Sequence, residues 1–364
     1  MDDTVRRVLS LVPRESFSLV ELLRLCHTCK GMRALITQNH GPIVVDVALD
    51  VEQMTSVCGL SVCSFDTEDL TYDVPIETTR DMLLRLCQFD VNYHVHSLSL
   101  DFCHEGYQAK LTNSATAGAD YHHHILLFSA LQSLKHMQRV HIYNVNLSTE
   151  LVAAYLPTFT GTDLSLVQCG LRIGPEFLNA IGRHQTLGLL SLSGNSFVDC
   201  IGRVNVLGTN LQVLNCSDCV SADVSVLFSG GDPSSLVELY WNDNHIPEDH
   251  RCAMYAWLTS CANLTTLGLR NSSLCGSDAS ALLSALERVP RLTCLDLACN
   301  EFREDVLAFA ELMPRLRQLY ISARRCHHAA LGVAWCATRK LRRDDKFCMY
   351  EELEFEDLDV DVDA

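Results

Sequence analysis

The side chains with the most obvious capacity for chemistry are cysteines. Cys26 and Cys29 have the Cys-x-x-Cys spacing of half a zinc site or of a redox pair, and Cys216 and Cys219 repeat that spacing. Neither pair has a second pair at the distance that a zinc ribbon or finger requires. The first pair stands in a helical pattern of leucine and valine, where cysteine is an ordinary small buried side chain. We therefore expect no metal ion and no redox reaction at these cysteines.

Histidines are the second candidate. His122, His123 and His124 are consecutive, so on a helix their side chains point in three directions and cannot all bind one ion. We interpret them as the solvated start of a helix, although nearby histidines leave open a weak metal or pH-sensitive patch. No nucleophile motif, phosphate-binding loop or pair of catalytic carboxylates stands out in the sequence. We therefore expect no enzymatic activity and no cofactor.

A repeated segment predicts the strands and helices on which any functional side chain would stand. It reads Leu-x-x-Leu-x-Leu-x-x-Asn-x-Leu and is clearest from Leu187 and from Leu292. Alternating apolar residues predict a short strand in each copy, and the stretches between copies, such as 247–258, 276–290 and 303–314, have helical spacing. The copies start 24 to 28 residues apart, at Met137, Gly161, Leu187, Leu211, Leu236, Leu264, Leu292 and Leu316.

This strand-and-helix repeat resembles the ribonuclease-inhibitor type of leucine-rich repeat over residues 93–322. The resemblance implies an α/β fold, a leucine-rich-repeat solenoid or horseshoe with parallel concave strands and convex helices. At the ninth repeat position, an Asn or Cys is expected to satisfy backbone groups where the chain leaves the strand. Residues 228–236 are rich in turn formers and are expected to interrupt the helical pattern. An insertion is expected near residues 105–120.

The N-terminal segment has a different pattern. Its leucines and the run Cys29-Lys-Gly-Met-Arg33 resemble an F-box, although Met32 replaces the usual tryptophan and the usual opening motif is absent. The resemblance implies that Leu9, Leu11, Leu25 and Leu35 contact a Skp1-type adaptor. The alternative is a helical cap that shields the first open face of the repeat core. Predicted boundaries are 1–40 for this element, 41–322 for the repeats, 323–350 for a C-terminal cap and 351–364 for an acidic tail.

Composition narrows the class of partner. The net charge of −17 argues against nucleic acid, and no apolar stretch is long enough to span a membrane. The N-terminus is acidic where a signal peptide carries positive charge, and the scattered cysteines show no disulfide framework. We therefore expect an intracellular protein of the cytoplasm or nucleus, in a reducing compartment.

The residues expected to carry function are the solvent-facing positions of the strands. Tyrosine and arginine at such positions are typical of protein interfaces, because they bury a large area and keep a polar group. We therefore predict a protein-interaction module, with three alternatives: an F-box-type substrate receptor of a ubiquitin ligase, a scaffold or structural subunit, or an enzyme regulator. The predicted partner-binding residues are Arg139, His141, Tyr143, Glu238, Tyr240, Asn242, Asp243, Arg270, Asp296 and Tyr320.

Overall fold

The computed structural model divides the chain into two compact units, residues 1–165 and 166–364. The boundary falls within strand β7 (Asp163–Val167). The residues that the structure describes are 43–50, 65–66, 71–75, 93–102, 108–112, 127–129, 131–198, 210–221, 232–302, 305, 308–309, 312, 315–323 and 346–351.

The first unit contains the start of the repeat sheet. Strands β1 (Ile43–Asp50), β4 (Tyr93–Asp101) and β6 (Arg139–Tyr143) pair in parallel, and β6 is followed by α7 (Thr149–Tyr155) and the 3-10 turn η2 (Leu156–Thr158). A separate small sheet joins β2 (Phe65–Asp66), β3 (Thr71–Pro75) and β5 (Gln108–Thr112). Strand β5 lies within the stretch predicted as an insertion, and it pairs outside the repeat sheet.

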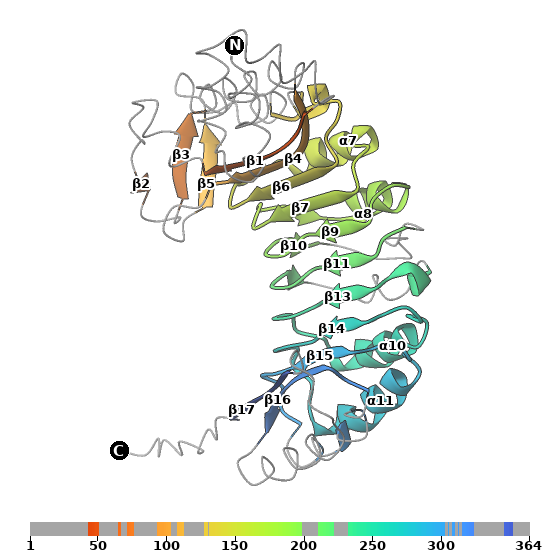
Figure 1. Cartoon of the computed structure of the whole chain (residues 1–364). Coiled ribbons are helices and arrows are strands. Elements are labelled where there is room, and N and C mark those ends of the chain that lie inside the picture. The colour runs from red at the N-terminus through yellow and green to blue at the C-terminus, as the bar shows by residue number, and fades with distance from the viewer. Residues whose placement is uncertain are drawn as a thin grey trace, which may run out of the picture. The chain divides into compact units, whose positions relative to one another are not determined.

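The second unit contains the strands of the predicted repeats from Leu187 onward. Its parallel strands pair in chain order, and Figure 1 shows them stacked from green to blue. The sequence did not predict the last strand, which starts 28 residues after its neighbour (346 − 318 = 28), as one further repeat would. The strands are β9 (Leu189–Ser191), β11 (Val213–Asn215), β13 (Glu238–Tyr240), β14 (Thr266–Gly268), β15 (Cys294–Leu297), β16 (Gln318–Ala323) and β17 (Lys346–Glu351).

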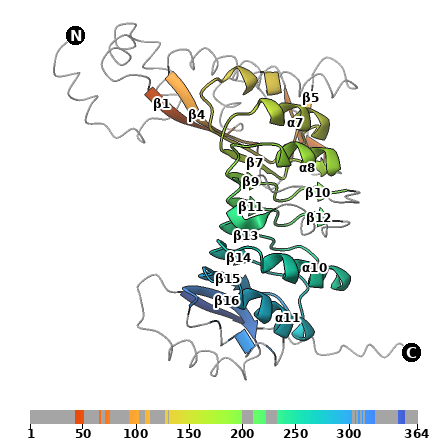
Figure 2. The ribbon, with the colours of Figure 1, turned by 90° about the vertical axis from the view of Figure 1, so that its right-hand side faces the viewer.

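The opposite side of the second unit carries helices and a minor sheet, as Figure 2 shows. Helices α10 (Glu248–Leu258) and α11 (Gly276–Glu287) confirm the helical spacing of 247–258 and 276–290. In the segment predicted as a break, the described residues 232–236 hold the 3-10 turn η3 (Pro233–Ser235). Most of 303–314 lies outside the described residues. The other elements here are α8 (Pro175–Gly182), β8 (Arg172–Ile173), β10 (Ser196–Phe197) and β12 (Val220–Ser221).

Leucines of successive repeats form the core between these two layers. The first, fourth and sixth repeat positions are buried in each described copy of the second unit, as Leu292, Leu295 and Leu297 illustrate. Because strand side chains alternate, the third and fifth positions must then face away from this core. Parallel strands on one side and helices on the other confirm the α/β leucine-rich-repeat solenoid.

The ninth repeat position acts as expected. The Asn195 amide oxygen accepts from the backbone N–H groups of Cys169 (3.1 Å) and Leu171 (3.0 Å), and its NH₂ donates to the carbonyls of Leu166 and Leu192. Asn300 does the same four repeats later. Each asparagine thereby satisfies backbone groups of the preceding repeat as well as its own.

The asparagines alternate with smaller donors. Between Asn195, Asn244 and Asn300, the ninth position holds Cys219 and Ser272. The Cys219 thiol donates to the Leu192 carbonyl (3.3 Å) and the Ser272 hydroxyl to the Trp241 carbonyl (3.3 Å). One asparagine in every second repeat therefore suffices, because its oxygen accepts the N–H of the smaller residue next to it.

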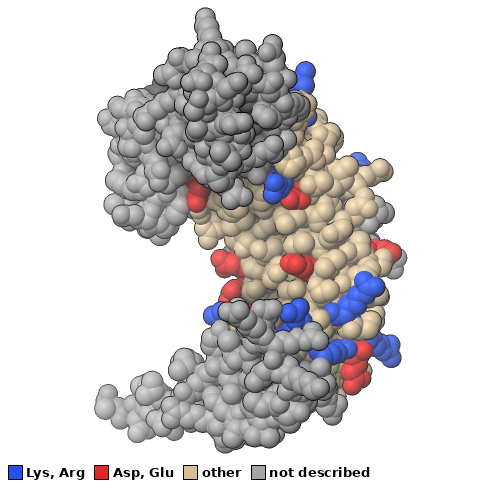
Figure 3. Space-filling model, in the orientation of Figure 1, with Lys and Arg blue, Asp and Glu red and all other residues tan. Residues whose placement is uncertain are grey.

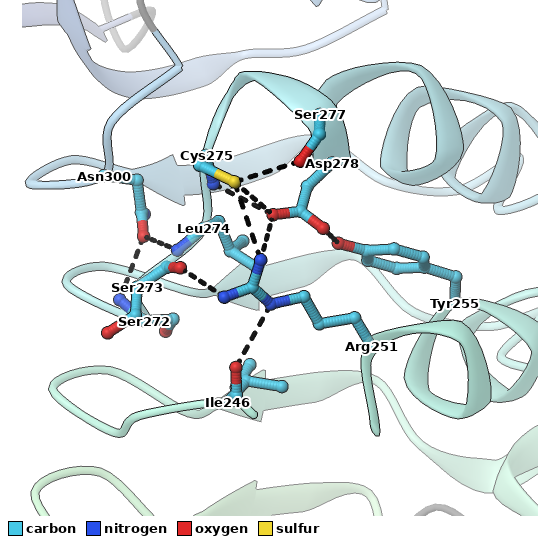
Figure 4. A network of polar contacts seen from close by, with 10 residues as sticks. All are labelled: Ile246, Arg251, Tyr255, Ser272, Ser273, Leu274, Cys275, Ser277, Asp278 and Asn300. Carbon is cyan, nitrogen blue, oxygen red and sulfur yellow. Dashed lines mark hydrogen bonds and ion pairs between the residues drawn. The ribbon is translucent and has the colours of Figure 1, made fainter. Parts of the chain in front are cut away.

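A buried ion pair joins two successive repeats on the helical side, as Figure 4 shows. Arg251 on α10 donates to a carboxylate oxygen of Asp278 on α11 at 2.6 Å, and also to the carbonyls of Ile246 and Ser273. The hydroxyl of Tyr255 donates to the other oxygen of Asp278 at 2.9 Å. Arg251 and Asp278 are each less than a tenth exposed. Their charged groups are therefore shielded from water and depend on these hydrogen bonds.

Candidate functional site

The solvent-facing side of the second unit's strands is the candidate site. We define the strand face as the third, fifth, seventh and eighth repeat positions of β9 to β16. Two rows cross it in register. Glu238 pairs with Thr266 and then Cys294, and the neighbouring row is Tyr240, Gly268, Asp296 and Tyr320. Adjacent strands lie about 4.8 Å apart, so each row is a continuous line of side chains.

The structure brings seven predicted binding residues together on this face. Five of them are half-buried, which is typical of side chains that lie along a sheet, and Asp243 and Arg270 are exposed. The half-buried five are Glu238, Tyr240, Asn242, Asp296 and Tyr320.

Some of these side chains already serve the fold. An Asp296 oxygen accepts from the backbone N–H of Ala298 at 3.0 Å, and the Asn242 oxygen accepts from that of Arg270 at 3.0 Å. A Cβ at Gly268 would lie 2.6 Å from the Asn242 amide oxygen, so Asn242 occupies the space that glycine leaves. This role of Gly268 was not predicted from the sequence. The one indication is that a glycine stands at a repeat position where the neighbouring strands carry larger side chains.

The other contacts on the face join side chain to side chain. The hydroxyl of Tyr240 donates to Glu238 at 2.8 Å, and the Cys294 thiol donates to the amide oxygen of Gln318 at 3.4 Å. Burial and the carboxylate of Asp296 raise the pKa of Cys294, with Glu238 adding to the effect. Burial raises the pKa of Asp296 as well, and Asp243 adds to that effect, while the hydrogen bond from Ala298 and the nearby Arg270 partly offset it. The face therefore disfavours any further negative charge.

The three predicted residues of the first unit form a separate group on β6. Arg139, His141 and Tyr143 are half-buried and alternate with buried Val140 and Ile142. The rings of His141 and Tyr143 stack with centroids 6.3 Å apart. Burial lowers the pKa of His141, and nearby Asp163 only partly offsets that effect. The imidazole is therefore neutral at pH 7.

The described cysteines behave as core residues or free surface thiols. Cys216 and Cys219 are buried at the sixth and ninth repeat positions, and burial raises the pKa of Cys219 to about 11. The repeat thus accounts for this Cys-x-x-Cys pair. Among the described side chains, no group of three or more His, Cys, Asp or Glu residues is placed to hold a metal ion. Nor is any helix of the described segments long and apolar enough to cross a membrane.

Several predicted features lie outside the described residues. They are the F-box-like leucines Leu9, Leu11, Leu25 and Leu35, the pair Cys26 and Cys29, the histidines from His122 to His124, and nearly all of the acidic tail.

Comparisons with known proteins found matches among solved structures alone. No family model matches the sequence, and no curated protein matches it significantly. Among solved structures, an internalin from Listeria monocytogenes is similar with a TM-score of 0.42 and 13% identity, over 88% of each chain. The leucine-rich-repeat ectodomain of the receptor kinase GASSHO1/SCHENGEN3 from Arabidopsis thaliana, solved with CASPARIAN STRIP INTEGRITY FACTOR 2, gives 0.35 and 14%. That match covers 85% of this chain and 29% of the ectodomain chain.

The chain folds as a leucine-rich-repeat solenoid. The parallel strands, the helices and the buried asparagines at the ninth position are the evidence for that fold.

Proposed function

We propose that this leucine-rich-repeat protein binds another protein through the strand face of its second unit. The observation that carries the proposal is the row of aligned residues that contains Tyr240, Asp296 and Tyr320. These side chains point away from the leucine core. Tyrosine is enriched among the residues that dominate interface energies, and the surrounding short polar side chains provide a rim for hydrogen bonds. We also propose an intracellular, reducing compartment, because the cysteines are scattered along the sequence without a disulfide framework.

The test compares two double variants of the full-length chain. Tyr240→Ala with Tyr320→Ala removes both rings from the strand face. Glu248→Ala with Glu287→Ala changes two exposed residues on α10 and α11, on the helical side. Proteins recovered with the tagged wild-type chain are identified by mass spectrometry, and circular dichroism checks that each variant is folded.

We expect the tyrosine variant to lose partners that the helical-side variant retains. Each ring should contribute about tenfold or more to affinity, the scale of an interface hot spot. If the tyrosine variant recovers the same partners at wild-type levels, the strand face is not the binding surface. A scaffold and an enzyme regulator both use this surface, and the identity of the recovered partner distinguishes them.

For residues 1–40 we propose the role that the F-box resemblance implies, namely recruitment of a Skp1-type adaptor so that the strand face presents a substrate to a ubiquitin ligase. The sequence pattern around Leu25 and Leu35 is its only support. A pull-down with Skp1 tests it, and Leu25→Asp with Leu35→Asp should abolish recovery. Absent or unchanged binding would leave the capping role, in which deletion of residues 1–40 lowers the unfolding midpoint of the repeats.

A further inference from the structure

The strand face carries an excess of negative charge. Among its described side chains, Arg270 is the one base, and it lies close to Asp243 and Asp296. Figure 3 shows acidic side chains over the middle strands of this unit. The acids of the strand face are Asp218, Glu238, Asp243 and Asp296.

Two of these acids are held in place with a gap between them. Glu238 lies on β13 and Asp296 on β15, in neighbouring rows, so their Cα positions are about 12 Å apart, two strand spacings across the sheet and two residues along it. The intervening strand β14 presents Thr266 and Gly268 at the matching positions, and the Asn242 amide lies over Gly268. Within the described segments, no group of three or more His, Cys, Asp or Glu residues is placed to hold a metal ion. The space over Thr266 suits the long side chain of a lysine or arginine, which brings its own charge and apolar stem.

Tyrosine residues stand at the two ends of the row that contains Asp296. Tyr240 precedes Gly268 in the row, and Tyr320 follows Asp296. The hydrogen bond from the Tyr240 hydroxyl to Glu238 fixes the orientation of that ring next to the acid. The face of an aromatic ring attracts a cation, and the effect grows when the cation is partly removed from water.

The titration of neighbouring groups agrees with this arrangement. The pKa of Cys294, which lies on the strand of Asp296 and in the row of Glu238, is raised by burial and by both carboxylates. A bound cation would offset that negative potential in a half-buried setting, where charges are screened less than in bulk water.

We propose that the strand face binds a basic, extended segment of a partner protein, with a lysine or arginine side chain between Glu238 and Asp296 and against Tyr240, and with the next part of the segment against Tyr320. The inference rests on the proposed function and adds the chemical class of the partner. A polypeptide is favoured because the acids and rings extend across several neighbouring strands, which an extended chain can follow. Nucleic acid is disfavoured because its phosphates would meet this negative face.

The test uses a fluorescent peptide of about ten residues that alternates lysine and serine, long enough to cross β11 to β16 at about 3.3 Å per residue. A matched peptide carries glutamate in place of lysine. Fluorescence anisotropy measures the affinity of each for the full-length chain, at low and at physiological ionic strength. The strand-face variant is Glu238→Gln with Asp296→Asn, and the control is Glu248→Gln with Asp249→Asn on the exposed side of α10.

The strand-face variant preserves the local hydrogen bonds. Gln at position 238 still accepts from Tyr240, and Asn at position 296 still accepts from the N–H of Ala298. Asn215 already makes the same bond to Ser217 at the equivalent position of β11, at 3.0 Å. Lost peptide binding therefore reports lost charge rather than a misfolded strand.

We expect the lysine peptide to bind at least tenfold more tightly than the glutamate peptide, and more weakly as salt rises. The strand-face variant should lower that affinity at least tenfold, and the control should change it less than twofold. Equal losses in both variants, or no preference for the lysine peptide, would overturn the inference. If the preference is absent but Tyr240→Ala with Tyr320→Ala still loses the recovered partners, only the basic-segment inference fails and the proposed function stands.

Discussion

Two sets of polar side chains lie within a few residues of each other in the repeats of the second unit, and their surroundings are opposite. The ninth-position residues Asn195, Asn244 and Asn300 are at most 3% exposed, and their hydrogen bonds go to the backbone. The strand-face residues Tyr240 and Asp296 are half-buried and face away from the core.

The difference separates stability from recognition within one repeat. A buried amide that satisfies backbone groups of two repeats cannot change without leaving those groups unpaired. A half-buried side chain on the strand face makes no such hydrogen bonds to the core. Its polar group or ring can therefore contact a partner. Asp296 lies between these cases, because one of its oxygens holds the turn at Ala298.

A substitution at the ninth position should have the largest effect on stability. Asn300→Ala should lower the free energy of unfolding by about 3 to 5 kcal/mol, because the buried N–H groups of Ser272 and Leu274 lose their acceptor. Urea unfolding followed by circular dichroism measures the loss. The matched control is Asn215→Ala on the strand face, which should cost about 1 kcal/mol. Similar losses for the two variants would contradict the division of roles.

The ion pair on the helical side should give the next largest effect. Arg251→Met leaves Asp278 buried without its main partner and should cost about 3 kcal/mol. A double-mutant cycle with Asp278→Asn isolates the coupling, since asparagine still accepts from the Tyr255 hydroxyl. Strictly additive losses would show that Arg251 and Asp278 do not stabilise the repeats as a pair.

On the strand face, aromatic truncation should affect binding far more than folding. Tyr240→Ala should lower the free energy of unfolding by about 1 kcal/mol, because the ring is only half-buried. The same variant should weaken partner binding about tenfold or more. Isothermal titration with a recovered partner, together with urea unfolding, gives both numbers. A stability loss as large as that of Asn300→Ala would move Tyr240 into the structural set.

The smallest expected effect has the opposite sign. Burial raises the folded-state pKa of Asp296 above its ordinary value of 3.8, so the folded state binds the proton more tightly than the unfolded state. Its contribution to stability therefore falls as pH rises through that interval and stays unfavourable above it. Asp296→Asn should make the protein slightly more stable than wild type at pH 7, with the advantage shrinking below about pH 4. Thermal unfolding of both proteins across pH measures the difference, and a destabilised variant at pH 7 would be inconsistent with it.

The sequence predicted the repeat with its strands because leucines recur at a fixed interval and alternate within each copy. The same alternation predicted which side chains face outward, from Glu238 to Tyr320. Strand β17 escaped prediction because Phe347 and Met349 stand where leucines mark the other repeats.

The side-chain contacts between repeats could not be predicted from the sequence. Arg251 and Asp278 are 27 residues apart, and each alone reads as an ordinary charge on a helix. Likewise, nothing in the pattern shows that Asn242 lies over Gly268 or that Asp296 already accepts a hydrogen bond. These assignments depend on stacking one repeat on the next, which fixes partners that are distant along the chain.

Site-specific photo-crosslinking would show which surface of the second unit contacts a partner protein. A photoreactive phenylalanine analogue is introduced at position 240, at position 320 or, as a control, at exposed position 256 on α10. If the strand face is the binding surface, one partner protein will crosslink to positions 240 and 320 and not to position 256. Crosslinking at position 256 with none at position 240 or 320 would show that the strand face is not the binding surface.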